Sequence, residues 1–177
     1  MSSSSLPLFI DAVAFAAYKH RKQKRKDAEA SPYINHPIAL AQVLAREAKV
    51  GDEQVLIAAI LHDTIEDTKT TLEELRDGFG LPIAAIVAEV SDDKSLPPER
   101  RKELQVEHAP HLSERAKLIK LADKICNLRD VANTPPVDWD LNKRREYFDW
   151  AKRVIDGLRG VHPQLEALFD VAYAARP

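Results

Sequence analysis

The chain has 177 residues, 45% of them hydrophobic and 31% charged, and a formal net charge of −2 at pH 7. A chain of this size fits one domain with a buried core, and these fractions exclude a disordered or fibrous protein. The near balance of charges gives no general attraction to nucleic acid or to membranes, and a single cysteine, Cys126, excludes an internal disulfide.

Helical spacing of apolar residues begins after a loose leader expected at residues 1–5. Apolar positions recur every three or four residues from position 6 to about position 22, which predicts a first helix. A polar segment at 24–35 follows, and Pro37 suits the first turn of a second helix. Because His36 precedes this proline, we expect it to be extended at the mouth of that helix.

A central helix is predicted after Asp52, which suits an N-cap. The seven residues 55–61 are all apolar, so we expect this helix to be buried on every side. Further helices are expected at 71–79, 81–90, 98–109, 113–133, 141–158 and 163–174, with loops at 91–98 and 134–137. No segment has the spacing of a strand, so the sequence predicts an all-α fold, one compact helical bundle over residues 1–177.

Ionisable side chains gather at the end of the central apolar helix, in the segment Leu61-His62-Asp63-Thr64-Ile65-Glu66-Asp67. If the helix continues, its four ionisable residues share one face. Asp123 lies among apolar residues of a later helix, and His36 at another helix mouth. Burying such groups is costly unless a cation or mutual hydrogen bonds compensate.

Two interpretations of these residues remain open from spacing alone. A single buried histidine or aspartate is more often a hydrogen-bonded core residue than a ligand. Two imidazoles and two carboxylates from three elements, however, form a donor set that suits one divalent ion such as Mn²⁺, Fe²⁺, Co²⁺ or Zn²⁺. The candidate metal ligands are His36, His62, Asp63 and Asp123.

The order of these motifs resembles the HD superfamily of metal-dependent phosphohydrolases. The segments Tyr33-Ile34-Asn35-His36-Pro37, 61–68 and Lys120-Leu121-Ala122-Asp123-Lys124 are similar to the hydrolase domain of RelA/SpoT-type alarmone enzymes. Residues 92–94 and 147–151 resemble the small stand-alone alarmone hydrolases, and the resemblance runs from about Phe15 to Leu158. It implies an HD-type bundle that uses Mn²⁺ to convert ppGpp or pppGpp into GDP or GTP and pyrophosphate. The chain is too short for a synthetase domain, so we expect hydrolysis alone.

The same resemblance implies roles for three polar residues. Glu66 and Asp67 are similar to the family's Glu-Asp pair, which activates or orients the attacking water. Asn127, one turn after Asp123, would fix the substrate or the nucleophile near the metal. A carboxylate base is chemically reasonable here, because a metal-bound water needs only modest help at neutral pH.

A basic run at 19–26 has three interpretations. It can be a solvated helix end, a nucleic-acid or localisation patch, or a funnel for substrate phosphates. The balanced net charge and the absence of interleaved aromatic residues disfavour the nucleic-acid patch. The resemblance supports the funnel, with Arg25 and Lys26 contacting phosphates. Arg129 is a further candidate contact, although it can equally pair with Asp130 or Glu146.

Other candidates carry weaker signals. Tyr147 and Trp150 have the spacing of core residues, and by resemblance Tyr147 would contact the nucleotide. His108 and His111 can complete a second metal site, but Pro110 breaks their helical register, which favours one metal. Three further residues are expected to lie outside the site: Cys126 is expected to be buried, and His20 and His162 are expected at the surface.

Several alternatives concern the substrate and the cellular setting. The same metal site can act on adenosine alarmones or on the 2′-phosphate of NADPH, or the chain can be a binding module without turnover. Pro98 and Glu99 stand where related small hydrolases tend to place a basic residue, which leaves the 5′-phosphate contacts open. The single cysteine and the lack of a signal peptide or spanning segment predict a cytoplasmic protein whose partner is a nucleotide, not nucleic acid or membrane. A homodimer is compatible with the sequence.

Overall fold

The computed structural model describes residues 5–177. Its helices are α1 (Ser5–Lys19), α2 (Asn35–Gln42), α3 (Glu53–Leu61), α4 (Thr64–Asp67), α5 (Leu72–Phe79), α6 (Leu81–Val90), α7 (Pro98–His108), α8 (Glu114–Asn133), α9 (Leu141–Asp156) and α10 (Pro163–Tyr173). A π-helical turn, η1 (Val43–Glu47), extends α2, and a 3₁₀ turn, η2 (Ala109–His111), follows α7. Residues 5–177 contain no strand beyond one isolated bridge between Lys24 and Pro32, so the predicted all-α fold is confirmed.

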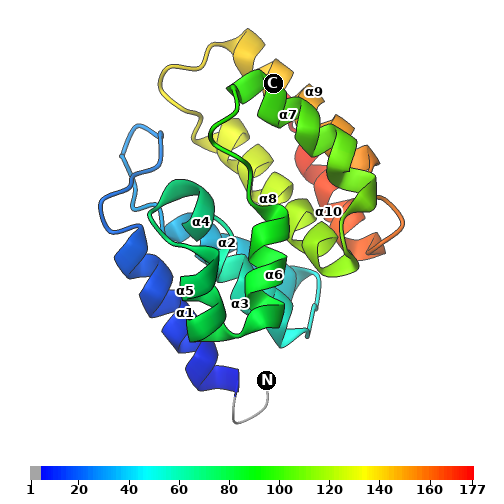
Figure 1. Ribbon diagram of the computed structural model, residues 1–177. Coiled ribbons are helices and arrows are strands. Elements are labelled where there is room, and N and C mark those ends of the chain that lie inside the picture. Colours follow the sequence, from blue (N-terminus) through cyan, green and yellow to red (C-terminus); the bar gives the residue numbers. More distant parts are fainter. Residues whose placement is uncertain (1–4) are drawn as a thin grey trace.

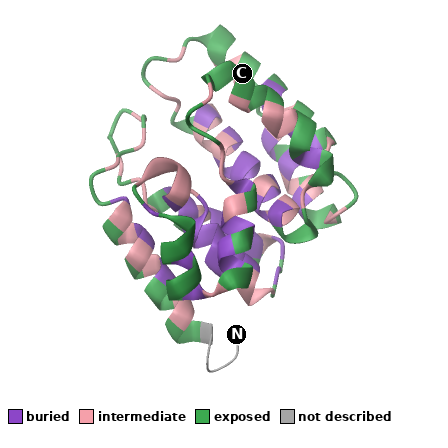
Figure 2. Cartoon of the chain, in the orientation of Figure 1, coloured by how far each residue is buried: buried purple, intermediate pink, exposed green. Residues whose placement is uncertain are grey.

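Helix α3 lies at the centre of one half of the molecule, and all of its residues from Val55 to Leu61 are buried (Figures 1 and 2). Asp52 caps its N-terminus by accepting hydrogen bonds from the backbone N–H groups of Gln54, at 2.9 Å, and Val55, at 3.3 Å. Helices α1, α2, α6 and α8 pack around it. Each large apolar side chain of α3 therefore contributes roughly 1.5–3 kcal/mol of burial.

Helix α8 joins the two halves of the fold. It packs against α2, α3 and α6 on one side and against α9 and α10 on the other (Figure 1). Ser113 caps it, because the serine hydroxyl accepts a hydrogen bond from the N–H of Ala116 at 3.2 Å. The buried stretch from Leu121 to Cys126 includes Asp123, so this carboxylate faces the interior as a consequence of the packing on both sides.

Several boundaries differ from the predictions. Residues 1–4 of the expected leader lie outside the described residues, and Ser5 already belongs to α1. The first helix ends at Lys19, because the chain turns and the N–H of Gln23 bonds to the carbonyl of His20 at 2.8 Å. The helices predicted to end at 109, 158 and 174 end at 108, 156 and 173.

The expectation of an extended His36 is wrong, because this residue lies in the first turn of α2. The N–H of Asn35 bonds to the carbonyl of Pro32 at 3.2 Å, and the N–H of His36 bonds to the carbonyl of Tyr33 at 3.0 Å. The chain is thus already wound before Pro37, whose missing N–H costs nothing in a first turn. Within the described part of the chain, no helix is long and apolar enough to cross a membrane.

Candidate metal centre and active site

Three elements bring the candidate metal ligands together. Helix α2 carries His36, the junction between α3 and α4 carries His62 and Asp63, and α8 carries Asp123. The junction is nearly helical, since His62 has φ −55° and ψ −36° and Asp63 has φ −95° and ψ −1°. The hydroxyl of Thr64 donates to the carbonyl of Leu61 at 2.7 Å at this break. The ionisable residues that follow the apolar run therefore stay on one side of the chain, as predicted.

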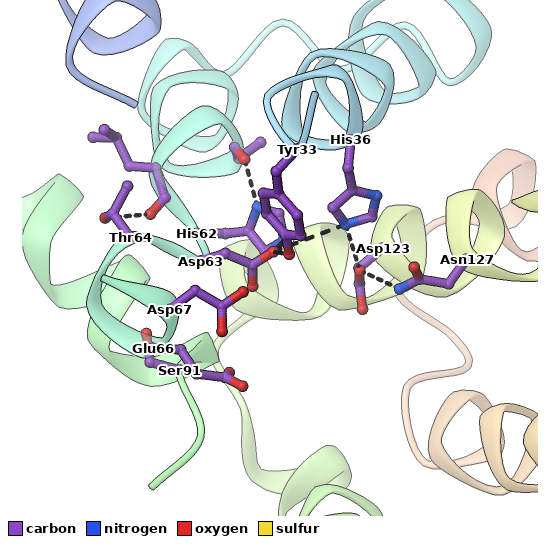
Figure 3. Close-up of polar contacts among 12 residues, drawn as sticks. Tyr33, His36, His62, Asp63, Thr64, Glu66, Asp67, Ser91, Asp123 and Asn127 are labelled. Carbon is purple, nitrogen blue, oxygen red and sulfur yellow. Dashed lines mark hydrogen bonds and ion pairs between the residues drawn. The ribbon is translucent and has the colours of Figure 1, made fainter. Parts of the chain in front are cut away.

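The four side chains point toward one another (Figure 3). Nε2 of His36 lies 3.2 Å from Oδ1 of Asp123 and 3.9 Å from Oδ2 of Asp63. Nε2 of His62 lies 2.8 Å from Oδ2 of Asp63. One nitrogen or oxygen from each of His36, His62 and Asp123 falls within 4.8 Å of the others, and all three residues are buried. The predicted ligands thus form one cluster.

The hydrogen bonding of His62 fits a cation at this cluster. Its Nδ1 lies 2.8 Å from the carbonyl oxygen of Ala59, and a carbonyl only accepts, so Nδ1 carries the hydrogen. Its buried Nε2 has no hydrogen-bond partner and faces the carboxylate of Asp63. Two facing electron pairs require a proton or a metal ion between them. The donor set of imidazoles and carboxylates suits a divalent ion.

The charges of the cluster have clear physical causes. Burial opposes the charge of His62, but the adjacent Asp63 outweighs burial and raises the pKa of His62 to about 9. Burial likewise opposes the charge of Asp123, yet Lys124 and the histidines hold the pKa of this carboxyl well below its usual range. Both carboxylates of the cluster are therefore ionised at neutral pH, which is the form that binds metals, whereas His62 must release a proton when a metal binds.

Neighbouring donors fix both carboxylates in place. The hydroxyl of Tyr33 donates to Oδ2 of Asp63, and burial raises the tyrosine pKa so that it keeps its hydrogen. The amide of Asn127 donates to Oδ1 of Asp123 at 2.6 Å, and the ammonium of Lys124 donates to Oδ2 of Asp123 at 2.9 Å. Such outer contacts set the orientation of metal ligands.

Glu66 lies beside the cluster, on α4. Its Oε2 accepts a hydrogen bond from the N–H of Asp92 at 3.2 Å, and its Oε1 lies 3.5 Å from the guanidinium of Arg101. Burial, more than any neighbouring charge, raises the pKa of Glu66. A raised carboxylate pKa beside a candidate metal centre is typical of a catalytic base.

Asp67, also on α4, is held at both of its oxygens. The Gln23 amide donates to Oδ2 at 2.7 Å, and the Lys94 ammonium donates to Oδ1. With both oxygens occupied, Asp67 is better suited to orienting a neighbour than to accepting a proton.

The cluster opens into a cavity of about 260 Å³, which Glu66 and Asp67 also line. Five cations line the cavity, namely Arg25, Arg101, Lys102, Lys120 and Lys124, together with five carboxylates, namely Asp63, Glu66, Asp67, Asp92 and Asp123. A second, larger cavity of about 980 Å³ adjoins it, with Arg25, Asn127 and Tyr147 lining both. Positive charge beside a metal centre favours phosphate groups.

The candidate substrate contacts divide into two groups. Arg25 and Lys26 line the larger cavity, and the guanidinium of Arg25 lies 2.6 Å from the carboxylate of Asp130. Arg129 lines neither cavity, because it forms a paired ion contact with Glu47 at 2.8 and 2.9 Å. Its partner is therefore neither of the two acidic residues that the sequence suggested.

The basic run at 19–26 divides in the same way. Lys19 pairs with Glu74 at 2.7 Å, and Arg21 lies over the ring of Tyr18. Lys24 lines the larger cavity with the two basic residues that follow it. The part of the run that faces the cavities is therefore its second half.

Several other expectations have clear outcomes. Cys126 is buried, and burial raises the pKa of its thiol to about 12, so it is the expected inert core residue. Trp150 is buried as expected, and its indole N–H donates to the carbonyl of Lys102 at 3.0 Å. His162 is half-buried and caps α10. Across residues 5–177, His108 and His111 belong to no cluster of three potential metal ligands.

The expectation that His20 lies at the surface is wrong, since it is 2% exposed. It follows Ala12 and Ala16 at four-residue spacing, and both alanines are fully buried. That periodicity is the signal that would have placed His20 inside. Sequence reasoning also assigned no site role to several residues that line the cavities, among them Gln23, Lys94, Lys102 and Trp139.

Comparisons with known proteins extend this description. A family model described as an HD domain matches residues 12–149. Guanosine-3′,5′-bis(diphosphate) 3′-pyrophosphohydrolase MESH1 of Danio rerio is 52% identical over 166 residues, which cover 94% of this chain and 92% of that protein. The Homo sapiens protein of the same name is 54% identical over 157 residues, covering 89% of this chain and 88% of the relative.

A solved structure is also similar over nearly the whole length. It is described as a metazoan orthologue of SpoT that hydrolyses ppGpp and plays a role in starvation responses. It matches with a TM-score of 0.93 and 47% sequence identity, and the match covers 96% of this chain and 95% of that chain.

Proposed function

The chain belongs to the HD-domain family, and from this membership we propose that it removes the 3′-diphosphate of the guanosine alarmones ppGpp and pppGpp. The products are pyrophosphate and GDP or GTP. The match to the solved structure confirms the expected HD-type helical bundle. The observation that carries the proposal is the buried His-Asp cluster at the base of a cation-lined cavity, in a chain similar over nearly its whole length to alarmone pyrophosphohydrolases.

The cluster would hold one divalent ion through His36, His62, Asp63 and Asp123, and Mn²⁺ is the ion that we propose. When bound, such an ion polarises a phosphoryl oxygen and lowers the pKa of water. The donor set also accepts Fe²⁺, Co²⁺ and Zn²⁺. Metal analysis of the purified protein, with Asp63→Ala for comparison, tests the assignment.

Glu66 is the residue that we assign as general base. It would take the proton of the water that attacks the phosphorus bonded to the ribose 3′ oxygen. The bond between that phosphorus and the 3′ oxygen breaks, and the 3′ oxygen takes up the proton that the water has lost, so that pyrophosphate and a free 3′ hydroxyl are formed. Two observations support this role. The pKa of Glu66 is raised, and Glu66 lines the metal-side cavity, which is the cavity of about 260 Å³ into which the ligand cluster opens. Asp67, with both oxygens already bonded, would orient the reacting groups.

Binding of the diphosphate is assigned to Arg25 and Lys26, with Asn127 between them and the metal centre. Arg25 lines both cavities and lies 3.4 Å from Oδ1 of Asn127, which supports a phosphate site next to the metal. Tyr147 also lines both cavities, and its ring centroid lies 5.2 Å from that of Trp139. The two rings are inclined to each other by 52°, and each offers an apolar face against which a nucleoside could pack.

Positive charge for the 5′ phosphates of the substrate is still available, although Pro98 stands where related hydrolases tend to place a basic residue. This proline begins α7, and Arg101 and Lys102, in the same first turns of the helix, line the metal-side cavity. Lys102 is exposed, and its ammonium lies 5.6 Å from the ring centre of Trp150. These cations would replace the basic residue that related hydrolases tend to carry at the position of Pro98 or Glu99.

A substrate panel tests the proposed function. Purified protein with Mn²⁺ is assayed against ppGpp, pppGpp, ppApp, pppApp and NADPH, with Asp63→Ala as the control. We expect release of pyrophosphate from the guanosine nucleotides and none from the variant. Absence of pyrophosphate from every 3′-diphosphate nucleotide would contradict the proposal. Faster hydrolysis of ppApp and pppApp would assign the same site to adenosine alarmones. Release of orthophosphate from NADPH, with no hydrolysis of the other nucleotides, would assign it to NADPH.

A further inference from the structure

A glutamine connects a buried histidine to a carboxylate of the candidate active site. Oε1 of Gln23 lies 2.7 Å from Nδ1 of His20, and Nε2 of Gln23 donates to Oδ2 of Asp67 at 2.7 Å. Gln23 belongs to the turn after α1, whereas Asp67 ends α4, so residues 44 positions apart are joined. None of these three residues is a candidate metal ligand.

The chemistry of the three groups allows one arrangement. An ionised carboxylate only accepts hydrogen bonds, so the NH₂ of Gln23 must face Asp67. The carbonyl of the amide then faces His20, and Nδ1 of His20 must carry a hydrogen. The reversed amide would place two acceptors 2.7 Å apart at Asp67. The carboxylate of Asp67 therefore sets the orientation of the amide, and a hydrogen on Nδ1 of His20 holds the amide in that orientation.

The packing around His20 keeps this arrangement rigid. The histidine is 2% exposed, and its ring centroid lies 4.8 Å from that of Tyr33. The N–H of Tyr33 donates to the carbonyl of Gln23 at 3.1 Å, so backbone and side chain of the glutamine are both held. By contrast Lys94, which donates to the other oxygen of Asp67, has a side chain that is 47% exposed. Exposed ion pairs orient their partners weakly.

We propose that Gln23 is a positioning residue that holds the carboxylate of Asp67, and that His20 acts by fixing the Gln23 amide. The proposal rests on the proposed function in one respect, namely that Asp67 takes part in the reaction. Neither Gln23 nor His20 touches the reacting atoms in this scheme. In this scheme their side chains act on the reaction through Asp67, which makes the effect separable from a general loss of folding.

The first test replaces Gln23 by methionine, which keeps the length of the side chain and removes the amide. We expect kcat to fall ~10- to 100-fold, by analogy with the partners that orient metal ligands. KM, bound metal and thermal stability should change little. Gln54→Met is the matched control, because Gln54 pairs with Arg115 at the surface at 2.7 Å. A Gln23→Met enzyme with unchanged kcat would overturn the proposal.

A double-mutant cycle tests the route through Asp67. In an Asp67→Asn background, Gln23→Met should change kcat by less than about twofold, the usual limit of additivity. Equal losses in both backgrounds would show that Gln23 acts elsewhere, and the proposal would fail. His20→Phe should lower kcat in the native background, and it should have no further effect in a protein that already carries Gln23→Met. His20→Asn, which keeps a donor near the position of Nδ1, should recover part of the activity.

A measurement without turnover separates this proposal from the proposed function. In ¹⁵N-labelled protein, side-chain NMR of His20 should show the hydrogen on Nδ1, and Gln23→Met should perturb that signal. A hydrogen on Nε2 with Nδ1 bare would overturn the positioning scheme even if alarmones are hydrolysed. The expected signal in a protein inactive on every nucleotide would instead count against the proposed function alone.

Discussion

The backbone N–H of Asp92 donates a hydrogen bond to Oε2 of Glu66 at 3.2 Å, and so ties the loop after α6 to the candidate base. The carboxylate of Asp92 in turn accepts a hydrogen bond from the Gln105 amide on α7 at 2.6 Å. Arg101, one turn earlier on α7, lies 3.5 Å from the other oxygen of Glu66. The orientation of Glu66 therefore depends on a loop and a helix from outside the metal cluster.

Removing the charge of Glu66 tests its role as base. Glu66→Gln keeps the shape of the side chain but cannot take a proton, so we expect kcat to fall by ~10²- to 10⁴-fold. The bound metal, measured on the purified protein, should be unchanged, because Glu66 is outside the ligand cluster. Glu73→Gln, on the exposed surface of α5, is the matched control. Full activity with normal metal content would remove Glu66 from the mechanism.

The pH dependence of the reaction should respond to Asp92. Burial and, after it, the charge of Asp92 raise the pKa of Glu66. A base works only when deprotonated, so activity falls as the pH drops through this pKa. Asp92→Asn removes one raising charge, and the acidic limb of the kcat/KM profile should move to lower pH. Asp93→Asn, whose side chain bonds to Ser95, should leave the limb in place. A limb that moves upward in Asp92→Asn would contradict this assignment.

Tyr33 should affect the metal through Asp63. Its hydroxyl donates to Oδ2 of Asp63, and a phenylalanine keeps the ring but loses this hydrogen bond. Outer contacts of this kind are typically worth 10- to 100-fold in metal affinity or activity, so we expect Tyr33→Phe to weaken Mn²⁺ binding by roughly that factor. A metal titration measures it. Tyr173→Phe, which loses a surface contact with Asp149, is the control. Equal metal affinity in both variants would refute the prediction.

The sequence predicts best the features that local periodicity determines. The apolar run at 55–61 specifies a buried helix whatever surrounds it, and α3 is such a helix. Polar residues at apolar positions, such as Asp123, stand out for the same reason, and they gather in the cluster. Local pattern is thus enough to find a helical core and the residues that interrupt it.

Partners distant in the sequence are less predictable, because no local pattern encodes them. Arg129 pairs with a residue 82 positions earlier, and Gln23 with one 44 positions later. Both pairings depend on how the helices pack. For this reason the sequence suggested Asp130 or Glu146 as the partner of Arg129, and both suggestions were wrong. The prediction of an extended backbone at His36 was wrong for another reason. Hydrogen bonds formed before Pro37 outweighed the usual preference of a residue that precedes proline.

Arg129 provides a last prediction, which separates a structural role from substrate binding. Its ion pair with Glu47 lowers the pKa of that glutamate, chiefly through the hydrogen bond. A folded-state pKa below the unfolded value contributes stability at neutral pH, and this contribution is lost as the pH falls through the folded pKa. The side chains are 35% and 37% exposed, so solvent screening keeps the contribution at or below about 1 kcal/mol.

Arg129→Met should therefore lower the melting temperature at neutral pH by up to about 4 °C, the shift typical of 1 kcal/mol in a chain of this size. The difference should vanish in acid, where Glu47 is protonated in both proteins. KM for the nucleotide should not change, because Arg129 lines neither cavity. Arg25→Met should do the opposite, raising KM with less effect on melting. A raised KM with unchanged melting in Arg129→Met would make Arg129 a substrate contact after all.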